Sequence, residues 1–174
     1  MSAKITSINY CPVKSVSFQS VENCKIKKNI GIIGDRNFAF AKDLDLEQAK
    51  LFEKSPAERK GKWNKVLTLK NSPALNKYNF IFKDEKLTLT FKDNEILSID
   101  INQLTEREAL SNKISELESS LKQPITLMKN DAFPFFDTSI SKKVDFVNSV
   151  SLLNFQSIND FEKKVGKKIE TSIF

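Results

Sequence analysis

The sequence of 174 residues contains no histidine and only two cysteines. Without histidine the chain cannot build a histidine-dependent nucleophile triad or a histidine-ligated metal site, and it lacks the commonest general base. The two cysteines, Cys11 and Cys24, are too few for a four-thiolate zinc site and do not indicate a disulfide framework. No apolar run approaches the roughly twenty residues that cross a bilayer, and no signal-peptide pattern opens the chain. These absences predict a soluble, cytoplasmic protein with no membrane partner.

Apolar residues make up 40% of the chain and include fourteen phenylalanines, which indicates a packed core rather than a disordered chain. The formal net charge of +6 would suit nucleic acid if the lysines formed one patch. Most lysines instead alternate with acidic residues, and only Lys25, Lys27, Lys28 and the segment 163–168 are clustered. A solvated surface therefore explains the charge better than nucleic acid, which is not the expected partner.

Two short segments near the N-terminus combine turn-forming residues with groups that suit an anion. In the first segment Pro12 breaks the preceding strand and places Lys14 and Ser15 on a turn. About twenty positions later a Gly-x-x-Gly pair permits a tight bend that presents Arg36. An ammonium, a hydroxyl and a planar guanidinium together suit a phosphate. The structural alternatives are a solvated turn and a local ion pair between Arg36 and Asp35.

Alternating apolar residues between turn signals predict a mostly β N-terminal half. The clearest feature is a hairpin of residues 79–82 and 86–91, in which alternate apolar residues share one face. A helical turn is expected at residues 46–54, because Pro56 ends it. The other expected strands cover residues 4–10, 21–27, 37–42, 65–69 and 95–100.

One long helix is expected from Thr105 to about Lys122, because Thr105 and Glu108 have the spacing of a capping box and Pro124 follows. Its apolar stripe is typical of core packing rather than of a cofactor site. The stripe consists of Leu110, Ile114, Leu117 and Leu121.

The C-terminal part continues with alternating strand and helix signals. Residues 125–129 predict a strand, residues 133–136 an aromatic loop and residues 150–153 a further strand. A short helix follows, for which Ser157 is the expected cap and Gly166 the expected stop. The residues of this helix that are expected to face inward are Ile158, Phe161 and Val165.

The two N-terminal segments and their flanking strands resemble the N-terminal β-barrel domain of MOSC proteins. The best-known members of that family are the mitochondrial amidoxime-reducing components and their bacterial relatives. The family's Tyr-Pro-Val-Lys-Ser motif appears here with Cys11 inserted between Tyr10 and Pro12, and its Gly-x-x-Gly-Asp-Arg motif appears as residues 31–36. Residues 150–161 resemble the first strand and helix of the MOSC domain proper.

The resemblance implies an α+β, mostly β fold in which an N-terminal β-barrel-like domain precedes an incomplete MOSC β-barrel. The expected divisions are a barrel domain over residues 1–100, a connecting helix over 101–124 and the first part of a MOSC domain over 125–174. In the family this domain continues past the position of Phe174 to a cysteine that ligates molybdenum. Neither cysteine of this chain takes that place, so a truncated form without the metal ligand is expected.

The resemblance also implies that the ligand is the molybdenum cofactor, with Lys14, Ser15 and Arg36 at the family's contact positions. Asn154 and Phe155 match a second contact site. Intact members are molybdenum-dependent oxidoreductases that reduce N-hydroxylated compounds, or sulfur carriers, and the class is associated with pyridoxal phosphate binding. A truncated chain is expected to be inactive alone and could lack the cofactor. Its expected partners are the cofactor, a redox protein and a complementary C-terminal polypeptide.

Two other interpretations stay open. A small basic β-barrel could be a non-catalytic module that binds RNA or another anionic partner. Against this, exposed aromatic residues that would stack on bases are not expected, because the phenylalanines mostly alternate as core residues do. The chain could also be one half of a split protein that a second polypeptide completes.

Overall fold

The structure is a computed structural model that describes residues 4–28, 30–136 and 153–169. Within these ranges no helix is both long and apolar enough to cross a membrane. The helices are α1 (Leu46–Lys54), α2 (Pro56–Arg59), α3 (Leu104–Leu117), α4 (Phe155–Val165) and the 3₁₀ helices η1 (Trp63–Lys65) and η2 (Pro73–Lys77). The strands are β1 (Ile8–Tyr10), β2 (Gln19–Val21), β3 (Ile26–Lys27), β4 (Gly31–Ile32), β5 (Phe38–Lys42), β6 (Tyr78–Lys83), β7 (Lys86–Phe91), β8 (Asn94–Asp100) and β9 (Ile125–Lys129).

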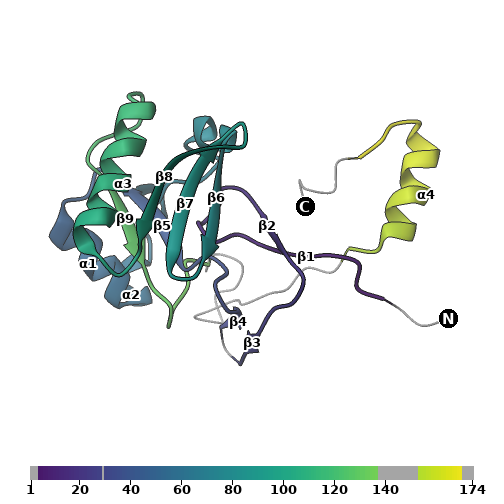
Figure 1. Cartoon of the computed structure of the whole chain (residues 1–174), viewed down its shortest axis with the longest axis horizontal. Helices are drawn as coiled ribbons and strands as arrows, with labels where there is room; N and C mark the ends of the chain where they lie inside the picture. The colour runs from purple at the N-terminus through teal and green to yellow at the C-terminus, as the bar shows by residue number, and fades with distance from the viewer. Residues whose placement is uncertain (1–3, 29, 137–152, 170–174) are drawn as a thin grey trace.

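The strands form several small antiparallel sheets, so the chain is a mixed α+β protein. The sheets pair β1 with β2, β3 with β4 and β5 with β9, and they join β6, β7 and β8 in a meander. Figure 1 shows β5 to β9 and helices α1 to α3 gathered in one body, from which β1 to β4 extend. The mixed class is as predicted, but the described strands form no closed barrel.

The meander of β6, β7 and β8 follows from its alternating sequence. Phe80, Leu87, Leu89 and Ile99 point into the core and are at most 2% exposed. The two residues between β6 and β7 have φ angles of 50° and 58°, which a two-residue hairpin turn requires. The predicted hairpin is therefore confirmed, with Phe80 opposite Leu89.

Strand β5 lies at the centre of the molecule because both of its faces are covered. Phe38 and Phe40 belong to a core cluster shared with the meander and α3. Ala39 and Ala41 point the other way, into a second cluster with α1. Strand β9 pairs with β5 along its whole length. It follows residue 124, where a domain boundary is expected, and it joins residues 125–129 to the N-terminal half of the chain.

Helix α3 packs against β8 and β9, but the predicted capping box is wrong. The helix begins at Leu104, one residue before the expected cap Thr105, and its N-terminus has no side-chain cap. The carboxylate of Glu106 instead accepts a hydrogen bond from the N–H of Asp100 at 2.5 Å, which ties the first turn to the end of β8. The helix ends at Leu117. Its buried residues are Leu110, Ser111 and Ile114.

Three predicted strands are wrong in extent. Of the strand expected at residues 4–10, only Ile8–Tyr10 forms β1. Over residues 65–69 only Val66 makes a bridge to β5, and this bridge is isolated. The chain turns immediately afterwards, because the side chain of Asn71 accepts a hydrogen bond from the N–H of Thr68 at 2.9 Å. The strand expected at residues 21–27 divides into the end of β2 and the two residues of β3.

Helix α4 confirms a predicted helix but not its cap. The side-chain oxygen of Asn154 accepts hydrogen bonds from the N–H groups of Gln156 and Ser157 at 2.9 and 3.3 Å. Asn154 is therefore the N-cap in place of Ser157. Gly166 ends the helix with a φ of 68°, as expected.

Two of the three residues of α4 that are expected to face inward, Phe161 and Val165, are exposed. Phe161 is 54% exposed and Val165 is 46% exposed. Figure 1 shows α4 apart from the body that contains β5 and α3, so packing against that body does not cover this face. Of the strand expected at residues 150–153, only Leu153 lies within the described ranges, and it is not in a strand.

Candidate anion-binding site

Two turns that are about twenty residues apart in sequence lie against each other at the start of β5. The N–H of Arg36 donates to the carbonyl of Cys11 at 2.5 Å, and the N–H of Phe38 donates to Pro12 at 3.1 Å. In return the N–H of Lys14 donates to the carbonyl of Phe38 at 2.8 Å. These bonds pair the backbones of the two segments, so the turns that carry Lys14, Ser15 and Arg36 are neighbours.

Ser15 and Arg36 both have left-handed backbone conformations. Their φ angles are 57° and 54°. Positive φ is uncommon outside glycine and costs free energy, so such residues persist where the surrounding structure holds them and often mark functional positions. Here each one lies in a turn that the other turn fixes through hydrogen bonds.

Asp35 supplies a carboxylate between the two turns. Its Oδ1 accepts a hydrogen bond from the N–H of Cys11 at 2.9 Å, and its Oδ2 lies 3.5 Å from Nη1 of Arg36. Burial raises the pKa of Asp35, while Arg36, the Cys11 N–H and Lys14 oppose that rise. The local ion pair anticipated as an alternative for Arg36 is thus present. It leaves one formal positive charge on the set of Lys14, Asp35 and Arg36.

Both cationic side chains of the site lie over aromatic rings. The ammonium of Lys14 is 5.1 Å from the ring centre of Trp63, and the guanidinium of Arg36 is 4.9 Å from that of Phe136. Such contacts attract a cation to the ring face and restrict its position. Lys14 is buried at 7% exposure, whereas the Arg36 side chain is 32% exposed and keeps a solvent-facing edge.

Arg59 of α2 holds the loop that carries Phe136. Arg59 is 2% exposed, and its guanidinium donates to the carbonyls of Phe52 and Phe133 at 2.7 Å and to that of Pro134 at 3.2 Å. The guanidinium also stacks 4.0 Å from the ring centre of Phe135. Phe135 in turn donates its N–H to the carbonyl of Arg36 at 2.8 Å. Arg59 therefore supports the bend at Arg36 from a distance.

Sequence reasoning missed Arg59, Trp63 and Phe136. Phe136 belongs to the aromatic loop that the sequence does predict, so its burial had a local signal. Arg59 and Trp63 lie in a polar stretch without periodicity, and their partners are distant in sequence; the Arg59–Phe133 bond spans 74 positions.

Asn154 and Phe155, the second pair of expected contact residues, are not brought to this site. The side chain of Asn154 is used in capping α4. Phe155 is 42% exposed, and Figure 1 shows its helix away from the turns before β5.

No cluster of three metal-ligating side chains occurs among the residues that the structure describes. Cys11 is buried and burial raises the pKa of its thiol to about 11, so the thiolate that a metal needs is disfavoured. The donor set of Lys14, Ser15 and Arg36 instead fits an oxyanion such as a phosphate.

The raised pKa predicts slow modification of Cys11. In a Cys24→Ser variant, iodoacetamide should label Cys11 at pH 7.5 at least tenfold more slowly in the folded protein than in urea, because burial and the small thiolate fraction both oppose the reaction. The rate should keep rising with pH toward about 11. A Cys11→Ser variant reports Cys24 alone as the control. Equal rates in the folded and unfolded protein would contradict this account of the turn.

Gly34 fixes the distance between the bend and β1. Its φ is +96°, and a Cβ here would lie 3.2 Å from Cε2 of Tyr10. Gly34→Ala should lower the free energy of unfolding by about 2 kcal/mol through backbone strain and this close contact. Gly61→Ala is the matched control, since φ is +74° there and no described atom lies within 4 Å of the added Cβ. Urea unfolding that gives equal losses for both variants would exclude a role for the Tyr10 contact.

Comparisons with protein-family models, with curated proteins and with solved structures find no match to this chain. The protein is therefore described by its fold and its site: it is a mixed α+β protein with a candidate anion site at the junction of two turns. Any more specific function depends on the residues of that site.

Proposed function

We propose that this chain binds a phosphate-bearing small molecule through Lys14, Ser15 and Arg36. The observation that supports the proposal most is the backbone pairing of the two turns, in which the N–H of Arg36 bonds to Cys11 and that of Lys14 bonds to Phe38. This pairing supports one shared site for the three donor side chains, although about twenty residues separate Arg36 from Lys14 and Ser15.

Each residue has a distinct part in this binding. The Arg36 guanidinium uses one edge on Asp35 and keeps an exposed edge for two phosphate oxygens. Ser15, which is half-buried, can donate its hydroxyl. Lys14 supplies a charge whose position the ring of Trp63 restricts. Together they offset the negative charge that Asp35 places at the same point.

From the resemblance to MOSC proteins we propose that the bound group is the pterin phosphate of the molybdenum cofactor. That cofactor, when bound, supplies redox chemistry at its metal, and in intact family members it serves the reduction of N-hydroxylated compounds. In this chain Lys14, Ser15 and Arg36 would hold the phosphate and so fix the pterin's orientation. The family's barrel arrangement, with residues 125–174 as the first part of a MOSC domain, belongs to the same proposal.

A matched pair of ligands tests the proposal without any substitution. The chain is titrated with hydroxymethylpterin monophosphate and with the same pterin lacking the phosphate. We expect the phosphorylated form to bind at least tenfold more tightly, because charge-assisted hydrogen bonds to the phosphate contribute about 1.5–3 kcal/mol each. The difference should shrink at high salt. Equal affinities of the two pterins would reject the phosphate site.

The observations support RNA binding less than they support binding of a phosphate-bearing small molecule. Contrary to expectation, some phenylalanines of the described residues are exposed, but they are divided among three parts of the chain. Phe18 precedes β2, Phe133 follows β9, and Phe155 and Phe161 both lie on α4. A steep loss of affinity for single-stranded RNA with salt, together with no discrimination between the two pterins, would favour RNA instead.

A further inference from the structure

An open cavity lies beside the anion site and is separate from it. Its volume is about 510 Å³, within the range of about 300–1,000 Å³ typical of small-molecule pockets. The β3–β4 hairpin, the β6–β7 turn and the residues just before β5 form its walls. Gly34 and Asn37 line it, whereas Lys14, Ser15 and Arg36 do not. We refer to it as the hairpin cavity.

Four side chains make up the apolar part of the hairpin cavity's lining, which we call its floor. Tyr10 and Phe82 contribute aromatic rings, and Ile30 and Ile33 contribute aliphatic side chains. Ile33 is 50% exposed, so an apolar side chain is left open to solvent at the wall of a cavity. Covering such a surface with an apolar group releases water and is favourable.

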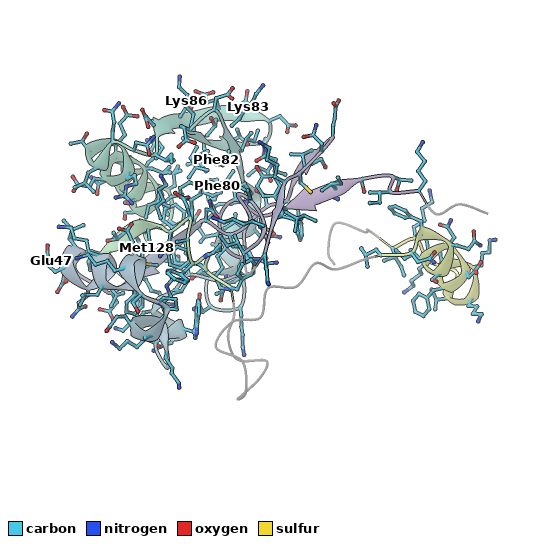
Figure 2. All side chains as sticks on the ribbon, turned by 90° about the horizontal axis from the view of Figure 1, so that it is seen from below. Glu47, Phe80, Phe82, Lys83, Lys86 and Met128 are labelled. Carbon is cyan, nitrogen blue, oxygen red and sulfur yellow. The ribbon has the colours of Figure 1, made fainter. Side chains whose placement is uncertain are left out.

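Charged residues of both signs surround this floor. Lys27, Lys83 and Asp84 line the cavity, and none of them forms an ion pair within the described parts of the chain. Figure 2 shows Lys83 beside Phe82, near the tip of the β6–β7 hairpin. Elsewhere in the lining, Asp131 accepts a hydrogen bond from the amide of Asn37 at 2.8 Å, and its other oxygen lies 3.4 Å from Nζ of Lys129. Both contacts fix the position of this carboxylate.

This distribution selects against ligands that carry one kind of charge. Asp84, Glu85 and Asp131 would repel an anion, and Lys27 and Lys83 would repel a cation. A ligand with one ammonium and one carboxylate can place each near side chains of opposite sign while its apolar part covers Ile33.

We propose that the hairpin cavity binds an amino acid with a large apolar side chain, as a zwitterion. The ammonium lies toward Asp84 and Asp131, the carboxylate lies toward Lys27 and Lys83, and the side chain lies on the apolar floor. This site is distinct from the proposed phosphate site and does not depend on it.

Phenylalanine and two singly charged analogues test the charge selection. The full chain is titrated with L-phenylalanine, with phenethylamine, which lacks the carboxylate, and with 3-phenylpropanoate, which lacks the ammonium. Amide chemical shifts of Ile33, Gly34 and Asp84 report binding. We expect phenylalanine to bind at least threefold more tightly than either analogue, a modest factor because exposed ion pairs are weak. No shift with phenylalanine, or equal affinity of either analogue, would overturn the proposal.

A variant of the apolar lining tests the location. Ile33→Arg replaces an apolar side chain of the hairpin cavity by a charged one and should remove phenylalanine binding, because the apolar part of the ligand loses its contact. Ile81→Arg is the matched control, since Ile81 is 44% exposed on β6 and does not line the cavity. It should bind phenylalanine like the wild type. Retained binding in Ile33→Arg would overturn the assigned location. Phosphopterin titration of Lys83→Ala keeps the two proposals apart, because Lys83 lines the hairpin cavity but lies in neither turn of the phosphate site. Its phosphopterin affinity should equal that of the wild type while its phenylalanine affinity falls.

Discussion

Replacing Arg59 by Ala is expected to lower the free energy of unfolding by about 3–5 kcal/mol. The guanidinium bonds to the buried carbonyls of Phe52 and Pro134 and to the partly buried carbonyl of Phe133. An alanine would leave these acceptors without a donor, at a cost of about 1–3 kcal/mol for each one that water cannot reach. It would also open a cavity beside the ring of Phe135.

Arg59 differs from an ordinary core residue because it is a charged group inside the protein. Burial lowers the pKa of Arg59 to about 10, and Glu53 opposes that shift. The side chain is therefore still protonated at pH 7, where its burial costs free energy that the carbonyl hydrogen bonds offset. Arg59→Lys should recover only part of the loss, because lysine keeps the charge but cannot place donors toward α1 and the loop at once.

Urea unfolding followed by circular dichroism measures both variants. Lys62→Ala is the control, because Lys62 follows α2 closely and is 55% exposed, so its loss should change stability by less than about 0.5 kcal/mol. A loss below about 1 kcal/mol for Arg59→Ala would show that water or a shift of the loop satisfies the three carbonyls.

The strands and helices that the sequence predicts well are those whose signal is local. The β6–β7 hairpin has alternating apolar residues on both sides of a two-residue turn, and helix α1 occupies the expected residues 46–54. The strand expected at residues 65–69 failed because alternation there reflects burial against β5 without continuous pairing. The capping box failed because α3 already begins at Leu104, which places Thr105 inside the first turn rather than at the cap.

The candidate site likewise contains residues with a local sequence signal and contacts that have none. Lys14, Ser15 and Arg36 stand beside the proline and glycines that shape their turns, so residue type and spacing were enough to select them. The pairing of Arg36 with Phe136 and the support from Arg59 depend on contacts between distant parts of the chain. No local pattern encodes such contacts, and the same holds for the hairpin cavity, which three separate turns enclose.

Arg36→Ala should weaken binding of the phosphopterin by about ten- to thirtyfold. A charge-assisted hydrogen bond contributes about 1.5–3 kcal/mol, and about 1.4 kcal/mol corresponds to a factor of ten. The lower part of that range applies, because the side chain is 32% exposed and already shares its charge with Asp35 at 3.5 Å. Arg36→Lys should restore part of the affinity, since it keeps the charge and loses the planar pair of donors.

Arg36→Gly separates binding from folding. At a φ of 54° glycine is free of the strain that any residue with a Cβ bears, so this variant should unfold at a temperature no lower than that of Arg36→Ala. It should nevertheless lose as much phosphopterin affinity, because the guanidinium is absent in both. Calorimetric titration gives the affinities, and thermal unfolding gives the stabilities. If Arg36→Gly binds the phosphopterin as tightly as the wild type, the guanidinium serves only to pair with Asp35 and to pack on Phe136, and the phosphate must be bound elsewhere.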